Sequence, residues 1–142
     1  MVLTDAEKAA MKELVAERKR DSKPGKRDKR AEGLADVLAK IGEMPDVDRV
    51  IAQRVHEIVT ETAPDLVPRT WYGMPAYTNA DGKVVVFFKP SVKFGSRYST
   101  LGFEDAAHLD AGAMWPTSYA LTEITDADAK KIAALVKKAA RP

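Results

Sequence analysis

Cysteine is absent from this chain of 142 residues, and histidine occurs only twice. Without cysteine, disulfide bonds, thiol chemistry and thiolate metal sites are excluded. No apolar run approaches the roughly 20 residues that a membrane-spanning helix needs. The first residues, Met1–Glu7, have neither the basic start nor the apolar stretch of a secretory signal. We therefore expect a soluble protein of the cytoplasm that does not engage a membrane.

Catalytic signatures are equally scarce. The sequence contains no G-x-S-x-G motif, no P-loop and no G-x-G-x-x-G motif. His56 has Ala52 and Thr60 four residues away on either side, so no acidic partner is evident on its own helix. We interpret it as a surface histidine. Catalysis by carboxylates stays open, but no residue is predicted to be catalytic, and we do not expect an enzyme.

Positive charge is concentrated in residues 18–30. This segment has eight basic and two acidic residues, a net charge of +6, which leaves −4 for the rest of a chain whose total is +2. Within it, Ser22–Gly25 contains proline and glycine and predicts a turn or linker. A solvated loop between helices is the simpler interpretation of such a charge run. The alternative is weak, salt-sensitive and non-specific binding of nucleic acid, because clustered lysine and arginine suffice to neutralise phosphates.

Apolar residues at helical spacing predict three helices in the N-terminal part of the chain. The first, at about residues 5–20, begins with a capping box of Thr4 and Glu7. Its apolar stripe is thin, as in a peripheral helix or one that docks a protein partner. Two more helices are expected at about 28–41 and 46–62.

From residue 66 onward the periodicity becomes that of strands. Strands are expected at residues 66–72, 76–79, 83–89, 97–103 and 116–121. The continuous apolar run of Lys83–Lys89 predicts a central strand covered on both faces. Turns are indicated at Gly73–Pro75 and Asn79–Gly82, and a last helix begins after Thr125. The predicted fold class is α+β, with an antiparallel sheet of about five strands against which N-terminal helices and a C-terminal helix pack.

Two aromatic clusters border the predicted sheet, at Thr70–Tyr77 and Gly112–Tyr119. If the two turns meet, they would form an aromatic cavity, and nearby cations would suit a small anionic or aromatic ligand. The alternative is that both tryptophans seal the core where the helices meet the sheet. The predicted ligand-binding residues are Trp71, Tyr72, Met74, Tyr77, Lys89, Arg97, Trp115 and Tyr119.

Four blocks of this region resemble one protein family. They are Trp71–Tyr77, Asp81–Val85 followed by Phe87-Phe88, Arg97–Phe103 and Gly112–Leu121. In this order they resemble the small bacterial YdhG-like proteins, a family of unknown function, over about residues 45–138. The family is grouped with YjbR/CyaY-like folds, so the resemblance also implies an α+β antiparallel fold. A chain of 142 residues fits one domain, so we expect a single YdhG-like domain over 1–142, with a peripheral helix and basic linker over 1–30 and a core over 31–142.

One branch of that family is named a frataxin-like iron chaperone, so the resemblance raises iron as a cargo. Iron held for delivery needs clustered carboxylates. The acidic residues of the first helix alternate with lysine and arginine, which is typical of a solvated face with its own ion pairs. Glu104 and His108 would form at most a weak metal pair on a short helix or loop over 104–110.

We therefore predict neither a metal site nor a cofactor in this chain. The favoured function is a small binding protein with an aromatic-lined pocket for an unidentified small molecule. The alternatives are an iron-binding chaperone, or a protein that uses residues 18–30 and the first helix to dock a partner or nucleic acid.

Overall fold

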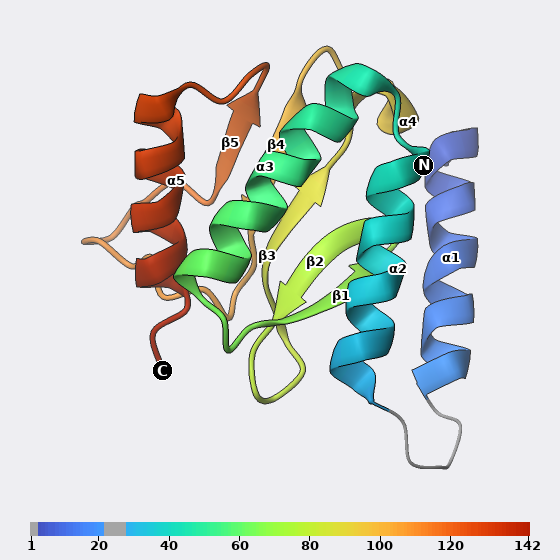
Figure 1. The fold of residues 1–142 in the computed structure, drawn as a ribbon, viewed down its shortest axis with the longest axis horizontal. Helices are drawn as coiled ribbons and strands as arrows, with labels where there is room; N and C mark the ends of the chain where they lie inside the picture. The colour runs from blue at the N-terminus through green and yellow to red at the C-terminus, as the bar shows by residue number, and fades with distance from the viewer. Residues whose placement is uncertain (1–2, 22–27) are drawn as a thin grey trace.

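The computed structural model of the chain describes residues 3–21 and 28–142 (Figure 1). The elements within these ranges are α1 (Asp5–Asp21), α2 (Lys29–Glu43), α3 (Asp46–Thr62), β1 (Val67–Trp71), β2 (Met74–Thr78), β3 (Val84–Lys89), α4 (Ser91–Phe94), β4 (Ser99–Phe103), β5 (Ser118–Leu121) and α5 (Asp126–Ala139). The predicted α+β class, with helices on either side of the strands in the sequence, is confirmed. The turn expected at Ser22–Gly25 lies outside the described residues. None of the described helices is both long enough and apolar enough to cross a bilayer.

Side-chain caps define where the helices begin. At the start of α1, Thr4 and Glu7 each accept the other's backbone N–H at 3.1 Å, which is the predicted capping box. Thr125 and Asp128 form the same arrangement at the start of α5. Asp28 accepts a backbone N–H of the first turn of α2 at 3.0 Å. These short-range caps are encoded in a few adjacent residues, which is why the sequence locates them well.

The five strands form an antiparallel meander in the order β1-β2-β3-β4-β5. Its tightest connection joins β1 to β2, where Trp71 pairs with Met74 and only Tyr72 and Gly73 lie between them. Both of these residues have positive φ, 53° and 74°, as a type I′ hairpin turn requires.

The predicted turn at Gly73–Pro75 is therefore displaced, since Pro75 lies inside β2 and pairs with Thr70. A proline has no N–H to donate to a neighbouring strand. The ladder between β2 and β3 begins only at Ala76, so the missing donor is tolerated.

A β-bulge between β2 and β3 determines which residues of β3 are buried. Consecutive residues of β2 pair with Val86 and Val84, so Val85 has no partner on that strand. Val85 and Val86 are 2% and 0% exposed, whereas Val84 and Phe87 are half-buried. The extra residue turns two successive valines toward the core. The strand is central in the sheet, as predicted, but the prediction that it is covered on both faces is wrong.

Helices α2, α3 and α5 cover one face of the sheet (Figure 1). The hydrophobic core lies between them and the strands, and it includes no residue of α1. Helix α2 approaches β1 closely, because a Cβ atom on Gly33 would lie 1.9 Å from the carbonyl oxygen of Pro68. Helix α1 lies beside α2 at the β1 edge of the sheet (Figure 1). We call the face opposite to α2, α3 and α5 the open face.

The short helix α4 was not expected from the sequence, and a buried carboxylate explains it. The N–H groups of Ser91 and Val92 donate to Asp48 at 3.1 and 2.9 Å. The hydroxyls of Ser91 and Ser99 donate to the same carboxylate at 2.6 and 2.8 Å. Burial of Asp48 opposes its charged form, but these hydrogen bonds together outweigh it and lower the pKa. Asp48 thereby ties α3 to the starts of α4 and β4.

Candidate functional site

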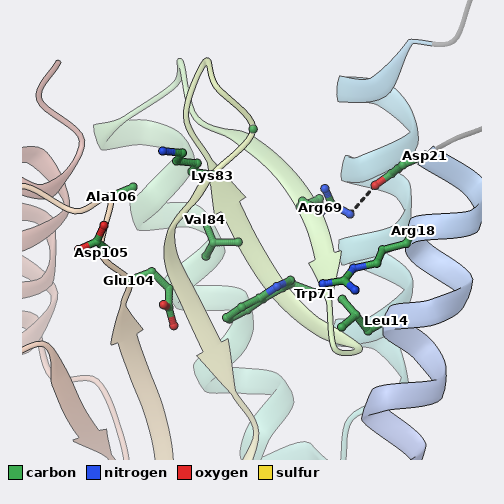
Figure 2. Close-up of a pocket in the computed structure, with 11 residues that line it drawn as sticks. Leu14, Arg18, Asp21, Arg69, Trp71, Lys83, Val84, Glu104, Asp105 and Ala106 are labelled. Atoms are coloured by element: carbon green, nitrogen blue, oxygen red, sulfur yellow. Dashed lines mark hydrogen bonds and ion pairs between the residues drawn. The ribbon is translucent and has the colours of Figure 1, made fainter.

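A groove of about 420 Å³ lies on the open face of the sheet, between α1 and the segment that follows β4 (Figure 2). We call it the Trp71 groove. It is lined by Leu14, Arg18 and Asp21 of α1, by Arg69 and Trp71 of β1, by Gly82, Lys83 and Val84, and by Glu104, Asp105 and Ala106. The groove is therefore assembled from four separate stretches of the chain.

The indole of Trp71 forms the centre of the groove. Its ring meets Tyr72 edge-on at 5.0 Å and Phe87 at 5.4 Å between centroids. Phe87 in turn covers Gly102, because a Cβ atom there would lie 2.1 Å from the tip of the phenyl ring. Edge-to-face contacts of this kind hold aromatic rings in a defined orientation. The half-buried Trp71 thus offers a supported apolar surface.

Charges of both signs surround this surface. Arg69 and Asp21 form an ion pair at 2.7 Å. Figure 2 shows Arg18 on one side of Trp71, with Glu104 and Asp105 on the other. Within the described part of the chain, none of these last three side chains forms an ion pair, and all three residues are exposed. The groove therefore has a cationic rim on α1 and an acidic rim after β4.

The turn after Trp71 connects the floor of the groove to its wall. The N–H groups of Tyr72 and Gly73 donate to the Glu17 carboxylate at 3.1 and 3.3 Å. Glu17 is only 6% exposed. A Cβ atom on Gly73 would lie 1.8 Å from Oε2 of Glu13, so the Glu13 carboxylate also lies directly against this turn. Sequence patterns did not reveal Glu17, since a glutamate among lysines on a helix is usually solvated.

Two larger hollows, of about 620 and 630 Å³, lie at the C-terminal end of α5 and along α3. Among the described residues, neither is lined by a tryptophan, tyrosine or phenylalanine. The Trp71 groove combines an aromatic surface with free charges, and we therefore take it as the candidate site.

The predicted ligand-binding residues do not converge on one site. Trp71, Tyr72 and Met74 lie together at the β1–β2 turn. Tyr77 faces the helices instead, because it is 1% exposed and contacts His56 of α3. Successive residues of a strand alternate between faces, so one run of sequence serves both the groove and the core.

The remaining predicted residues lie elsewhere. Trp115 and Tyr119, before and within β5, pack against the core cluster. Lys89 lies over the ring of Phe94, and Arg97 lies over its neighbour Tyr98. Four inter-strand spacings separate β1 from β5, and at about 4.8 Å each they amount to roughly 19 Å. The predicted meeting of the two aromatic clusters is wrong, because a meander puts its first and last strands at opposite edges.

His56 is not the surface residue that its helix neighbours suggest. Its Nδ1 atom lies 2.8 Å from the phenolic oxygen of Tyr77, and the imidazole is half-buried. The interpretation as a surface histidine is therefore wrong, because its partner belongs to a strand 21 residues away.

No described group of three or more histidine, aspartate or glutamate side chains is placed to hold a metal ion. Glu104 and His108 do not share a helix, since this segment forms turns. The N–H of His108 instead donates to the carbonyl of Ala139 at the end of α5.

No protein-family model, no curated protein and no solved structure matches this chain. The resemblance to YdhG-like proteins therefore stays a prediction.

Proposed function

We propose that this chain is a small cytoplasmic binding protein of the YdhG-like kind, whose ligand lies on Trp71. The observation that carries the proposal is the supported indole surface at the centre of a groove with free charges of opposite sign on its two rims. Ligand pockets usually combine an apolar surface with a few polar groups that set orientation.

The arrangement of charge suggests the class of ligand. An acidic group on the ligand fits Arg18, and an amino group fits Glu104 and Asp105. Since Trp71 lies between these rims (Figure 2), a planar ring carrying the two groups at opposite ends matches the groove. We therefore propose a small planar zwitterion as the ligand.

Fluorescence of Trp71 tests this proposal directly. The chain has two tryptophans, so Trp115→Phe leaves Trp71 as the single reporter. We expect 4-(aminomethyl)benzoate to change its emission saturably, and benzoate or benzylamine alone to bind several-fold more weakly. Arg18→Gln should weaken binding of the zwitterion and of benzoate, and leave benzylamine unaffected.

A matched control is Arg97→Gln, because Arg97 does not line the groove. This variant should bind all three probes as the parent does. If none of the probes changes Trp71 emission up to its solubility limit, or if Arg97→Gln weakens binding as much as Arg18→Gln, the proposal fails.

The nucleic-acid alternative has less support. Within the described part of residues 18–30, Arg20 pairs with Asp36 at 2.7 Å. Arg30 donates to the backbone carbonyls of residues 64–66 at 3.2 to 3.3 Å. Both guanidinium groups are thus already engaged within the chain.

A further inference from the structure

Acidic residues make most of the polar contacts between helix α1 and the rest of the described chain. Three of them, Glu13, Glu17 and Asp21, follow one another at intervals of four, which puts them on one face of the helix. All three contact groups outside α1. This face differs from the solvated, self-paired surface that the sequence suggested.

Each carboxylate of this acidic stripe has its own partner. Glu13 contacts Lys93 at 2.9 Å and Lys40 at 3.2 Å. Burial opposes the charge of Glu13, but the two lysines outweigh it and lower its pKa. Glu17 accepts the two N–H groups of the Tyr72–Gly73 turn, and Asp21 pairs with Arg69.

The groups beneath α1 form one surface that binds carboxylates. It consists of the side chains of Lys40, Lys93 and Arg69 and the N–H groups of Tyr72 and Gly73. Two successive residues with positive φ direct both N–H groups toward the same carboxylate, an arrangement that favours anions. We call it the carboxylate-binding surface.

The apolar attachment of α1 is small in comparison. Its buried residues are Ala10, Leu14 and Glu17, while Met11 and Val15 are 43% and 62% exposed. The hydrophobic core closes without any residue of α1. Ion pairs in partly exposed positions contribute little and are weakened by salt. If α1 left, the core cluster would keep all of its own residues.

We propose that α1 is a displaceable intramolecular ligand of the carboxylate-binding surface, and that an acidic helix of a partner protein takes its place. The partner helix would carry carboxylates at intervals of four residues, as α1 does. This spacing matches the lysines, the turn and Arg69 in sequence along the helix axis, so charge complementarity selects a helix over an irregular acidic chain.

Displacement would also alter the Trp71 groove. Leu14, Arg18 and Asp21 form one of its walls, and they would leave with α1. A bound acidic helix would therefore dismantle the site proposed for the small ligand, although the inference about α1 does not depend on that ligand.

Competition between the native α1 and an added copy tests the proposal on the full chain. The probe is a fluorescein-labelled peptide of residues 3–21, measured by anisotropy at low ionic strength. The Glu13→Gln/Glu17→Gln/Asp21→Asn protein should bind it about tenfold more tightly than the wild type does, because its own helix holds less firmly. A peptide carrying the same three substitutions should not bind.

Several results would overturn the proposal. They are equal affinity of both proteins for the peptide, equal binding of acidic and amide peptides, or equal binding of a scrambled peptide of the same composition. Displacement of the peptide by a single-stranded oligonucleotide at equal concentration would assign the surface to phosphates and would also overturn it.

A second measurement guards against a variant that fails to fold. In the wild-type protein, hydrogen exchange of the α1 amides should accelerate when salt is added, while exchange in α3 and β3 stays unchanged. If α1 exchanges only together with α3 and β3 at every salt concentration, α1 is an inseparable part of the fold and the proposal is wrong.

Discussion

The Nδ1 atom of His56 lies 2.8 Å from the phenolic oxygen of Tyr77, and this contact joins the middle of α3 to the second strand of the sheet. Burial lowers the pKa of His56, against a smaller opposing effect of Glu57. Burial also raises the pKa of Tyr77. Both groups are therefore held neutral at pH 7.

Stability should decrease on mild acidification because of His56. Its folded pKa lies below the ordinary value of 6.5, so the unfolded chain binds a proton at a higher pH than the folded chain. The contribution of neutral His56 is complete above about pH 6.5 and is lost as the pH falls from there through the folded pKa. The free energy of unfolding, measured by urea denaturation across this pH range, should decline less in His56→Gln than in the wild type. If both proteins lose stability equally with falling pH, His56 is not the cause of the decline.

Replacement of Asp48 should be among the most destabilising changes in the chain. Asp48→Ala leaves the buried donors of Ser91, Val92 and Ser99 without an acceptor, which costs about 2–4 kcal/mol of unfolding free energy. The exposed Asp46, on the same helix, is the control: Asp46→Ala should cost far less. The difference is measured by urea denaturation at pH 7, and similar losses in both variants would contradict it.

Alanine substitutions at Gly73 and Gly82 distinguish the cost of backbone strain from the cost of a steric collision. Both have positive φ, 74° and 77°, so alanine at either position costs about 1–2 kcal/mol. A Cβ atom meets nothing within 4 Å at Gly82 but would collide with Glu13 at Gly73. The Glu13 carboxylate is the flexible end of its side chain and can swing away from Lys93, so Gly73→Ala should lose up to about 1 kcal/mol more unfolding free energy than Gly82→Ala. Equal losses would mean that the ion pair between Glu13 and Lys93 does not stabilise the fold.

Gly102→Ala should be sensed at Trp71. The added methyl collides with Phe87, and Phe87 supports the indole, so the emission of Trp71 should shift in a Trp115→Phe background. A Cβ atom on Gly42 would meet no heavy atom within 4 Å, and Gly42→Ala should leave the emission unchanged. An unchanged spectrum in Gly102→Ala would show that Phe87 does not set the position of Trp71.

The accuracy of the sequence-based predictions depended on the range of the interactions involved. The capping boxes at Thr4 and Thr125 join residues three apart, and short apolar segments bounded by turn residues located the strands. Helix α4 was missed because its acceptor, Asp48, lies 43 residues before Ser91. The role of Glu17 was missed for the same reason, since Tyr72 lies 55 residues further along.

The sequence by itself determined the four long helices, the hairpin-linked strands and hence the antiparallel α+β fold, because periodicity, caps and turns are local properties. Only the tertiary structure decided that Trp71 of β1 and Tyr119 of β5 lie on strands at opposite edges of the sheet. It also decided that Glu13, Glu17 and Asp21 of α1 contact groups outside the helix. The physical reason is that a strand pattern specifies alternation but not which neighbour covers each face, and a carboxylate's environment depends on residues far away in the chain.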